Sequence, residues 1–411
     1  MRPLGADLSS YARDLQTQLK EKVLPYWYDT AVDWQRGGYL LSDDGSGHPP
    51  AATEKQLVTQ ARMVWGFSLA HENGYSDRHR DYLKAARNGY RFLVAHFRDP
   101  QAGGYYWKTD LSGQPVNDRK YLYGEGFVIY SLVEYYRASH DREARRRALE
   151  LYRTIQAHCH DPAHGGWIEH CQRDWTPITQ QDDRIEVELA GLRSANAHLH
   201  WMEALTELED ATHDAGVRAS LAEALRLNAT YFYPANPAQC SFHRHPDWTL
   251  VTGPRSAGLS YGHNVEFAWL MLRAEQVLRL QLSWTHFYAL LDHALAYGYD
   301  HTRGGLFSRG ADDTPATDTD KVWWVQAEML AALTVALQHQ PNPAYTTALE
   351  QLLGFLGTYQ VHPPDGIWYD TVAADGHPKR PDLAHNWKAN YHDVRAMLKF
   401  IDAYANPRPA R

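Results

Sequence analysis

The amino-acid sequence predicts an all-α fold, an (α/α)6 barrel with short β-hairpins in the loops at one end. Two observations predict it. A glycine-pair motif recurs about every sixty residues, and between its copies apolar residues follow a helical periodicity. Such a period is typical of a repeated supersecondary unit, and about six units fit into 411 residues. An open solenoid of the same helix pairs is the structural alternative. No Pro/Ser-rich linker divides the chain, so we expect one catalytic domain over residues 1–411.

The repeat can be followed in chain order. Each copy has an acidic residue, a glycine pair and an aromatic or apolar residue. The copies begin at Asp33, Asp99, Asp161 and Asp300, and Asp365-Gly366-Ile367-Trp368 closes the series. Successive glycine pairs lie 66, 62, 139 and 62 positions apart. Because 139 is near two periods, we expect a degenerate copy around residues 239–242.

Between the copies the pattern is helical. Apolar residues recur at three- and four-residue steps in residues 82–97 and again in residues 127–137. After each glycine pair a short aromatic alternation precedes a turn, as in residues 105–107 before residues 110–113, which predicts a small β-hairpin. Each unit is therefore helix, hairpin loop, helix, and the inner helices of a closed ring would face a central cavity.

Composition and net charge argue against several classes of protein. A formal charge of -8 argues against nucleic acid as a partner, and no apolar run approaches the length of a membrane span. Cys159, Cys171 and Cys240 are too few and too irregularly spaced for a disulfide framework, so we expect reduced thiols in a cytoplasmic protein. The chain is rich in rings with polar edges, with 14 Trp, 26 Tyr and 23 His, which is typical of a sugar-binding site.

The stretch from Ser260 to Leu270 is the first candidate site. Ser260 is a suitable N-cap, His263 falls in the first helical turn, and Glu266 lies on the same face three residues on. The helix dipole disfavours an imidazolium there, and a neutral imidazole beside a carboxylate suits a general base. The alternative is a helix-start histidine that is merely satisfied by that carboxylate.

Other polar residues lie in aromatic helices, where a buried charge needs a partner or a function. They are Arg62, Asn196 with His200 and Glu203, Trp324 with Glu328, Trp387 aligned with Tyr391 and Arg395, the adjacent His392, and Tyr123 in an aromatic helix entry. The structural alternatives are an ion pair between Arg62 and Glu54 or another carboxylate, a satisfied core position for His200, and core packing for the tryptophans.

No cofactor or metal site is expected. His198 and His200 would point in different directions on a helix. The His158-Cys159-His160 and His243-Arg244-His245 runs could chelate a metal on strands, but each lacks a nearby third ligand. Phosphate-binding glycine loops and serine-hydrolase elbows are absent from the sequence.

At these segments the sequence resembles the N-acylglucosamine 2-epimerase superfamily, within it the cellobiose 2-epimerase and mannose 2-epimerase branch. The resemblance runs from about Glu21 to Tyr404. It rests on Gln60-Ala61-Arg62, Asn196-x-His198-Leu199-His200, Ser260-Tyr261-Gly262-His263-x-x-Glu266, Trp323-Trp324-x-Gln326-Ala327-Glu328 and Trp387-Lys388-x-x-Tyr391-His392-x-x-Arg395. It implies an (α/α)6 barrel and cofactor-free epimerisation at C2 of a reducing sugar, or aldose–ketose isomerisation.

The resemblance also implies roles. His263 and His392 would exchange the C2 proton, while His200 and Arg62 would stabilise the oxyanion. Asn196, Glu266 and Glu328 would orient histidines and hydroxyls, and Trp324, Trp387 and Tyr123 would stack on the sugar.

Departures from the family pattern bear on the substrate. Tyr391-His392-Asp393-Val394-Arg395 replaces Tyr-His-Asn-Gly-Arg of the disaccharide-acting members, and Ala197 replaces their threonine. We therefore expect free mannose and glucose as substrates, with β-1,4-disaccharides such as cellobiose close behind. The rivals are a mannose–fructose isomerase, a helix-barrel glycosidase using Glu266 and Glu328, and a non-catalytic sugar-binding protein. A monomer or a homodimer is expected.

Overall fold

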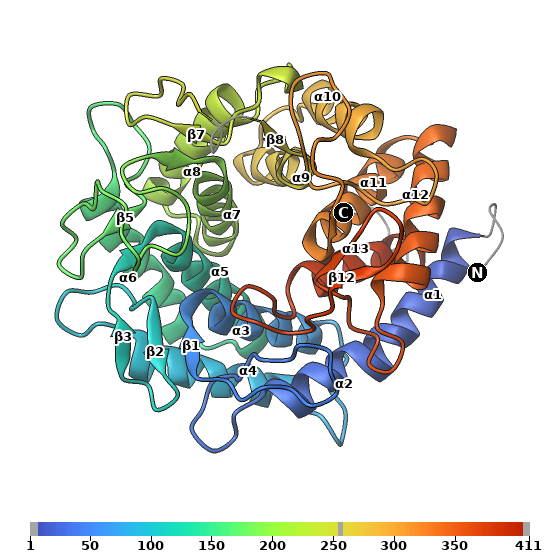
Figure 1. Ribbon diagram of the computed structural model, residues 1–411. Helices are drawn as coiled ribbons and strands as arrows, with labels where there is room; N and C mark the ends of the chain where they lie inside the picture. Colours follow the sequence, from blue (N-terminus) through green and yellow to red (C-terminus); the bar gives the residue numbers. More distant parts are fainter. Residues whose placement is uncertain (1–6, 254–257, 406–411) are drawn as a thin grey trace.

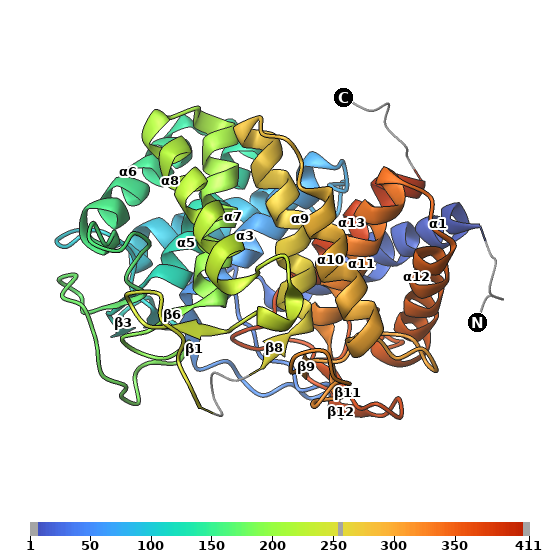
Figure 2. The ribbon, with the colours of Figure 1, turned by 90° about the horizontal axis from the view of Figure 1, so that it is seen from above.

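The computed structural model describes residues 7–253 and 258–405, which form a closed ring of helix pairs (Figures 1 and 2). The inner helices are α3 (Leu57–Glu72), α5 (Leu122–Ser139), α7 (Ala195–Thr212), α9 (Tyr261–Leu278), α11 (Trp323–His339) and α13 (His392–Tyr404). The outer helices are α1 (Leu8–Gln18), α4 (Tyr82–Phe92), α6 (Arg142–Cys159), α8 (Ala215–Leu227), α10 (Trp284–His293) and α12 (Pro343–Phe355). Because α1 packs against α13, the ring is closed and the open solenoid is excluded. The predicted (α/α)6 barrel is confirmed.

Short helical segments extend the outer helices. The first outer helix continues through η1 (Leu19–Val23), α2 (Leu24–Tyr26) and η2 (Trp27–Ala31). Single π-helical turns follow α4, α8, α10 and α12, namely η3 (Leu93–Phe97), η4 (Asn228–Phe232), η6 (Ala294–Gly298) and η7 (Leu356–Gln360), and η5 (Pro237–Gln239) is a 3₁₀ turn.

Inner and outer helices differ in how they are buried. The inner helices are buried on nearly every side, whereas an outer helix such as α6 buries one stripe, including Ala144, Ala148 and Leu151. Asp81, Asp141 and Asp214 cap outer helices by accepting backbone N–H groups of the first turn. A polar residue on an inner helix is therefore buried and needs a hydrogen-bond partner within the fold.

The sequence repeat is a specific turn. Asp99 accepts two backbone N–H groups of its own turn, and its second oxygen lies 3.3 Å from Lys120 Nζ. Gly104 adopts φ 67°, a conformation that favours glycine. Glu125, from the next inner helix, accepts the N–H of Tyr105 at 2.9 Å. The glycine-pair motif thus fastens a hairpin loop to the inner helix that follows it. We call this hydrogen bond between the inner-helix side chain and the loop backbone the latch.

The other copies use the same chemistry. The acidic residues that bind a basic residue of the next unit are Asp33 with Lys55, Asp161 with Arg193 and Asp300 with Lys321. The counterparts of Glu125 are Gln60, His198 and Gln326. In the last copy His362 takes the acidic position, and the degenerate copy keeps only the loop bond from Ser241 N–H to the Phe232 carbonyl.

Short antiparallel strands join consecutive units. The strands are β1 (Glu54–Gln56), β2 (Lys108–Asp110), β3 (Pro115–Asn117), β4 (Lys120–Tyr121), β5 (His170–Cys171), β6 (Arg193–Ser194), β7 (His243–Arg244), β8 (Leu259–Ser260), β9 (Arg309–Gly310), β10 (Lys321–Val322), β11 (Thr371–Val372) and β12 (Pro378–Arg380). They form the sheets β1-β2-β3, β10-β11-β12, β4-β5, β6-β7 and β8-β9. Each strand that leads into an inner helix pairs with the next unit, as Ser260 does with Arg309. Figure 2 shows the strands at one end of the ring, as predicted, so the inner helices point their N-termini there.

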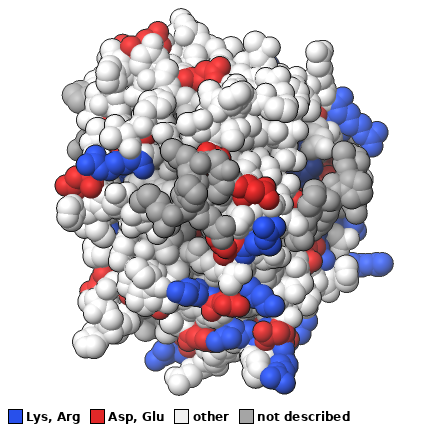
Figure 3. Space-filling view, turned by 90° about the vertical axis from the view of Figure 1, so that its right-hand side faces the viewer, with Lys and Arg blue, Asp and Glu red and all other residues white. Residues whose placement is uncertain are grey.

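On the face shown in Figure 3, basic and acidic side chains are interspersed, so neither sign of charge dominates there. Within the described ranges, no helix combines the length and apolar character needed to cross a bilayer. Cys159, Cys171 and Cys240 carry free thiols, as expected.

Candidate active site

The predicted site residues occupy the hairpin end of the ring, in the first two turns of the inner helices or just before one. They are Arg62 on α3, Tyr123 on α5, Asn196 and His200 on α7, His263 and Glu266 on α9, Trp324 and Glu328 on α11, His392 on α13 and Trp387 in the preceding loop. We call this group the hairpin-end site. Because the N-terminus of a helix carries partial positive charge, six such ends favour negative charge that develops there.

His263 is held by its own helix start. The Ser260 hydroxyl caps α9 and lies 2.8 Å from His263 Nδ1, and Asn196 Oδ1 lies 3.3 Å from Nε2. Burial lowers the pKa of His263 well below its ordinary value, and nearby His200 acts in the same direction. The expectation that Glu266 orients His263 is wrong, because the Glu266 carboxylate turns toward α13 and binds there.

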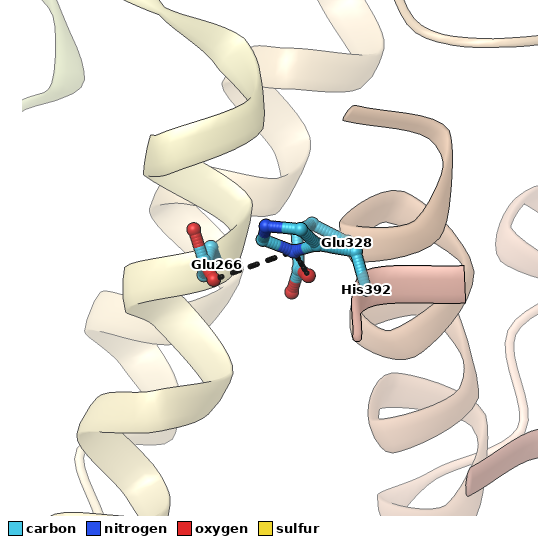
Figure 4. A group of neighbouring side chains, drawn as sticks. All are labelled: Glu266, Glu328 and His392. Atoms are coloured by element: carbon cyan, nitrogen blue, oxygen red, sulfur yellow. Dashed lines mark hydrogen bonds and ion pairs between the residues drawn. The ribbon is translucent and has the colours of Figure 1, made fainter. Parts of the chain in front are cut away.

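His392 begins α13 and faces two carboxylates (Figure 4). Its Nδ1 lies 2.6 Å from Glu328 Oε1 of α11 and 4.0 Å from Glu266 Oε1 of α9. Burial lowers the pKa of His392 to about 3, and the hydrogen bond to Glu328 opposes that shift. A carboxylate on Nδ1 fixes the proton there and leaves the Nε2 lone pair for chemistry.

Arg395 binds three carboxylates of this group. Its Nη2 donates to Glu266 at 2.9 Å and to Glu328 at 2.7 Å, and its Nη1 donates to Glu203. Although burial opposes ionisation, Arg395 and His392 hold the pKa of Glu328 down to about 2. Burial and the Glu328 charge raise the pKa of Glu266 well above its ordinary value. The cluster therefore places three carboxyl groups around one guanidinium, and Glu266 is the one whose ionised form is disfavoured.

The same cluster resembles a metal centre in its donor set. One ligand atom from each of Glu266, Glu328 and His392 lies within 4.8 Å of the others. A divalent cation would have to share these oxygens with the fixed Arg395 guanidinium, and two like charges at that spacing repel. The cluster fits an ion-paired support for His392 better than a metal site.

His200 is supported in the same way as His392. Its Nδ1 lies 2.8 Å from Glu203 Oε2, and the Tyr391 hydroxyl donates to the same carboxylate at 2.8 Å. Despite burial, Arg395 and His200 hold the pKa of Glu203 at about 2, while burial lowers the pKa of His200. Within the described part of the chain, neither His200 nor His392 uses Nε2 in a hydrogen bond.

Arg62 is a buried cation held by neutral groups. Its guanidinium donates to the Trp387 carbonyl at 3.0 Å and to the Tyr123 hydroxyl at 2.9 Å, and lies 4.3 Å from the Phe127 ring centre. No carboxylate of residues 7–253 or 258–405 lies within ion-pair distance of it, so pairing with Glu54 is excluded. A buried guanidinium in this state attracts a negatively charged group.

Half-buried aromatic rings complete the site. The Trp324 ring centre lies 4.6 Å from that of His263 and 5.8 Å from that of His392, so the indole contacts both histidines. Trp387 lies 6.4 Å from Tyr123, beside the Arg62 fork. These rings and histidines suit the C–H faces and hydroxyls of a sugar.

Comparisons with known proteins assign the chain to a protein family. A model of N-acylglucosamine 2-epimerase (GlcNAc 2-epimerase) matches residues 38–396. The chain belongs to the N-acylglucosamine 2-epimerase family. The cellobiose 2-epimerase of Dictyoglomus turgidum is 28% identical over 404 residues, covering 96% of this chain and 99% of that protein. The D-mannose isomerase of Marinomonas mediterranea is 25% identical and covers 93% and 95%. The structure of cellobiose 2-epimerase from Spirochaeta thermophila superimposes with a TM-score of 0.85 at 29% identity, covering 97% of each chain. The chain is thus an enzyme of the carbohydrate epimerase and isomerase class.

Three residues of this family member were not assigned to the site from sequence. Arg395 and Glu203 had a detectable signal, since each is a charge on a buried inner helix, one turn from a candidate histidine or tyrosine. Glu188 had none, because it lies in the loop between β5 and β6. It adopts φ 57° and accepts a hydrogen bond from Asn196 Nδ2 at 2.8 Å, so it supports the contact of Asn196 with His263.

Two local expectations differ from the structure. Trp387 does not share a helical face with Tyr391 and Arg395, because α13 begins only at His392. Tyr391, the N-cap of that helix, does contact Arg395, whose Nη1 donates to the Tyr391 hydroxyl at 2.6 Å. The chain turns before α13, where the backbone of Lys388 bonds to that of His385. The segment around Cys159 is the end of helix α6, not a strand.

Proposed function

We propose that this protein is a cofactor-free sugar 2-epimerase that inverts C2 of a reducing aldose. The observation that carries the proposal is the pair His263 and His392, which come from α9 and α13 and both contact Trp324. Each has Nδ1 engaged by its own support, Ser260 or Glu328. Two bases acting on one carbon are the minimum requirement for inversion by proton transfer.

The reaction balances without a cofactor. Ring opening gives the aldehyde, which acidifies the hydrogen on C2. One histidine takes that proton, the C2–H electron pair forms the C1=C2 bond, and the carbonyl electrons move to O1, giving a cis-enediolate. The other histidine returns a proton to C2 from the opposite face, and C1=O re-forms. Exchange with solvent restores both imidazoles.

Arg62 and His200 suit the oxyanion. Arg62 lacks a counterion within the described residues, so it can bind O1 and O2 as charge develops. His200 keeps Nε2 free of protein partners there, and it donates to the same oxygens as the imidazolium that the Glu203 carboxylate stabilises. Removing one such donor typically costs about 3 kcal/mol of transition-state stabilisation. The inner-helix N-termini add a field of the same sign.

We propose free mannose and glucose as preferred substrates, and β-1,4-disaccharides such as cellobiose second. The departures at Ala197, Asp393 and Val394 support this order. Relatives named for cellobiose and for mannose both match nearly the whole chain, so both sugars belong in the first assay.

A second candidate is a mannose–fructose isomerase, which the similarity to D-mannose isomerases favours. It forms the same enediolate and differs in delivering the proton to C1. A glycosidase is not supported, because Glu266 and Glu328 are bound to the same Arg395 nitrogen. Two glycosidase carboxyl groups would instead stand about 5 to 10 Å apart across the substrate.

Proton NMR of the purified protein with mannose, and separately with cellobiose, in D2O without added metal tests the proposal. Glucose carrying deuterium at C2 is the expected product from mannose. Fructose as the main product would assign the protein to the isomerase branch, and reaction of cellobiose alone would reverse the substrate order. No turnover of either sugar would contradict the proposed substrates, and cleavage of cellobiose would contradict epimerisation.

A further inference from the structure

A line of hydrogen bonds reaches His263 from outside its own helix. Asn196 Oδ1, on α7, lies 3.3 Å from His263 Nε2. Asn196 Nδ2 donates to Glu188 Oε1 at 2.8 Å, and Glu188 Oε2 lies 3.1 Å from Nε2 of His243 on β7. We call these four residues the Glu188 network. Its members come from α9, α7, β7 and the loop between β5 and β6, so segments far apart in the sequence assemble it.

The Glu188 carboxylate determines which way the Asn196 amide faces. Carboxylate oxygens accept hydrogen bonds, so they select the amide nitrogen, and the amide oxygen is left facing His263. A rotated amide would set its oxygen against the oxygens of Glu188. An oxygen beside Nε2 favours a proton on that nitrogen, whereas the Ser260 hydroxyl at Nδ1 can donate or accept. The network therefore favours a proton on His263 Nε2.

The surroundings of His263 oppose a second, charging proton on its ring. Burial lowers the pKa of His263 well below its ordinary value. The titratable groups of the described chain that act on this ring come from α7, β9, α13 and α11: they are His200, Arg309 and His392, which lower the pKa, and Glu328, which raises it. The Asn196 oxygen offsets part of this effect, because it accepts from the protonated Nε2.

The backbone at Glu188 has a conformation that favours glycine. Its φ is 57°, in the left-handed region that residues with a long side chain rarely adopt. Gly191, three residues on in the same loop, has φ 73° and is the residue type expected there. Both oxygens of Glu188 are nevertheless bound, and only 10% of its side chain is exposed. A disfavoured backbone that carries a fixed side chain toward the site indicates a function for that side chain.

We infer that Glu188 is a positioning residue, which holds the Asn196 amide oxygen toward His263 and so keeps a proton on Nε2 of that histidine. The use of this proton in catalysis rests on the proposed function. Because Ser260 holds Nδ1, Nε2 is the ring nitrogen that is left to exchange a proton with C2 of the sugar. The contact of 3.3 Å between Nε2 and Asn196 is long for a hydrogen bond, so the substrate can replace it.

Nitrogen NMR of protein with isotope-labelled histidine locates the proton directly, without substrate. The signals of His263 are assigned by their loss in His263→Ala. We expect Nε2 of wild-type His263 to carry the proton at neutral pH, and Nδ1 to lack it. In Glu188→Gly the freed Asn196 amide can turn and donate to Nε2, so the proton is expected to move to Nδ1. A proton on Nδ1 in the wild type would overturn the inference even if the variant failed to fold.

The pH profile of kcat measures the consequence for the reaction. Glu188→Gly removes both hydrogen bonds and relieves the positive φ, whereas Glu188→Gln keeps an acceptor for Asn196. We expect the limb of the profile that belongs to His263 to move about one pH unit lower in Glu188→Gly, with kcat about tenfold lower and KM little changed. Glu188→Gln should keep the wild-type limb. An unmoved limb in folded Glu188→Gly, or an equal shift in Glu188→Gln, would overturn the inference.

Asp312→Gly is the matched control. Asp312 is an exposed residue in the loop after β9, and it also adopts a positive φ, 48°. Its carbonyl, which a glycine keeps, lies 3.1 Å from His293 Nε2 on the outer helix α10. The control relieves the same backbone conformation and removes a carboxylate, so we expect the wild-type profile. The same shift in the control would overturn the inference. A wild type without turnover would contradict the proposed function, while the NMR signals would still decide where the His263 proton lies.

Discussion

Each histidine of the hairpin-end site has a different support, and the support defines its state. Glu328 holds His392 Nδ1, Glu203 holds His200 Nδ1, and a serine hydroxyl holds His263 Nδ1. A carboxylate stabilises the imidazolium more than a hydroxyl does, so a proton is held more readily on His392 than on His263. The two histidines of the proposed reaction therefore differ in how readily each holds a proton. This difference suits a reaction in which one histidine removes the C2 proton and the other returns a proton to the opposite face.

His263→Ala and His392→Ala test the proposed pair. Each removes one of two proton-transfer groups, so we expect kcat to fall by about 10²-fold or more while the far-UV circular dichroism is unchanged. Deuterium incorporation at C2 in D2O measures both proton removal and proton return. Normal turnover by either folded variant would contradict the two-histidine mechanism.

Arg62→Met tests the unpaired guanidinium. The substitution keeps an apolar stem against Phe127 and removes the fork that holds Tyr123 and the Trp387 carbonyl. We expect kcat/KM to fall roughly 10²-fold, which corresponds to a loss of about 3 kcal/mol of transition-state stabilisation, because a charge that stabilises the oxyanion is lost. A fall in unfolding free energy with unchanged kcat/KM would make Arg62 structural.

At the residue scale, the sequence predicted which side chains gather at one site better than how they are paired. His263, His392, His200 and Arg62 all lie at the hairpin end, as the resemblance implied. Two partners are local, Ser260 for His263 and Glu203 for His200. The partners of His392 and Arg62 come from other elements, so no local pattern encodes them. Glu266 illustrates this: its spacing from His263 predicted a contact within α9, but the Arg395 charge across the barrel holds it instead.

The element that organises the barrel is the latch between hairpin loop and inner helix. Gln326 Oε1 accepts the N–H of Leu306 at 2.8 Å, and its Nε2 donates to the Leu306 carbonyl at 2.7 Å. Gln60 does the same for Tyr39 at 2.9 Å each way. The glycine-pair spacing predicted the loop. The glutamine on the following helix, about twenty residues on, belongs to the family motifs at Gln60 and Gln326, but nothing in the sequence predicted its contact with the loop.

Gln326→Ala tests the latch. Two buried backbone groups of Leu306 lose their partners, and each unsatisfied group costs about 1–3 kcal/mol. We therefore expect the unfolding free energy to fall by about 2–4 kcal/mol, measured by urea denaturation. Gln114→Ala, on an exposed hairpin turn, is the control and should be nearly neutral. Equal effects of the two substitutions would show that the latch does not stabilise the barrel.

Across the whole molecule, buried titratable groups divide into two classes with opposite pH effects. His198 and His392, with pKa lowered by burial to about 3, bind protons more weakly folded than unfolded, so acidification below 6.5 destabilises the fold. Glu125 and Glu169, with pKa raised by burial to about 7, bind protons more tightly folded, so stability falls as pH rises from 4.5 to 7. The two classes offset each other between 4.5 and 6.5.

Glu125→Gln separates these classes. Glu125 occupies the latch position where two other copies carry glutamine. Its Oε2 is buried with no hydrogen-bond partner among the described residues, which suits a neutral group. In the wild type, folding holds a proton on Glu125 between the ordinary pKa of 4.5 and about 7, and that contribution is lost as pH rises through this window. The glutamine amide does not ionise, so the variant keeps this contribution to stability at every pH in the window. Urea midpoints of variant and wild type should therefore coincide near pH 4, and the variant should be more stable near pH 8, by about 1.4 kcal/mol for each unit of the raised pKa. Parallel stability curves for the two proteins would mean that Glu125 titrates as it does in the unfolded chain.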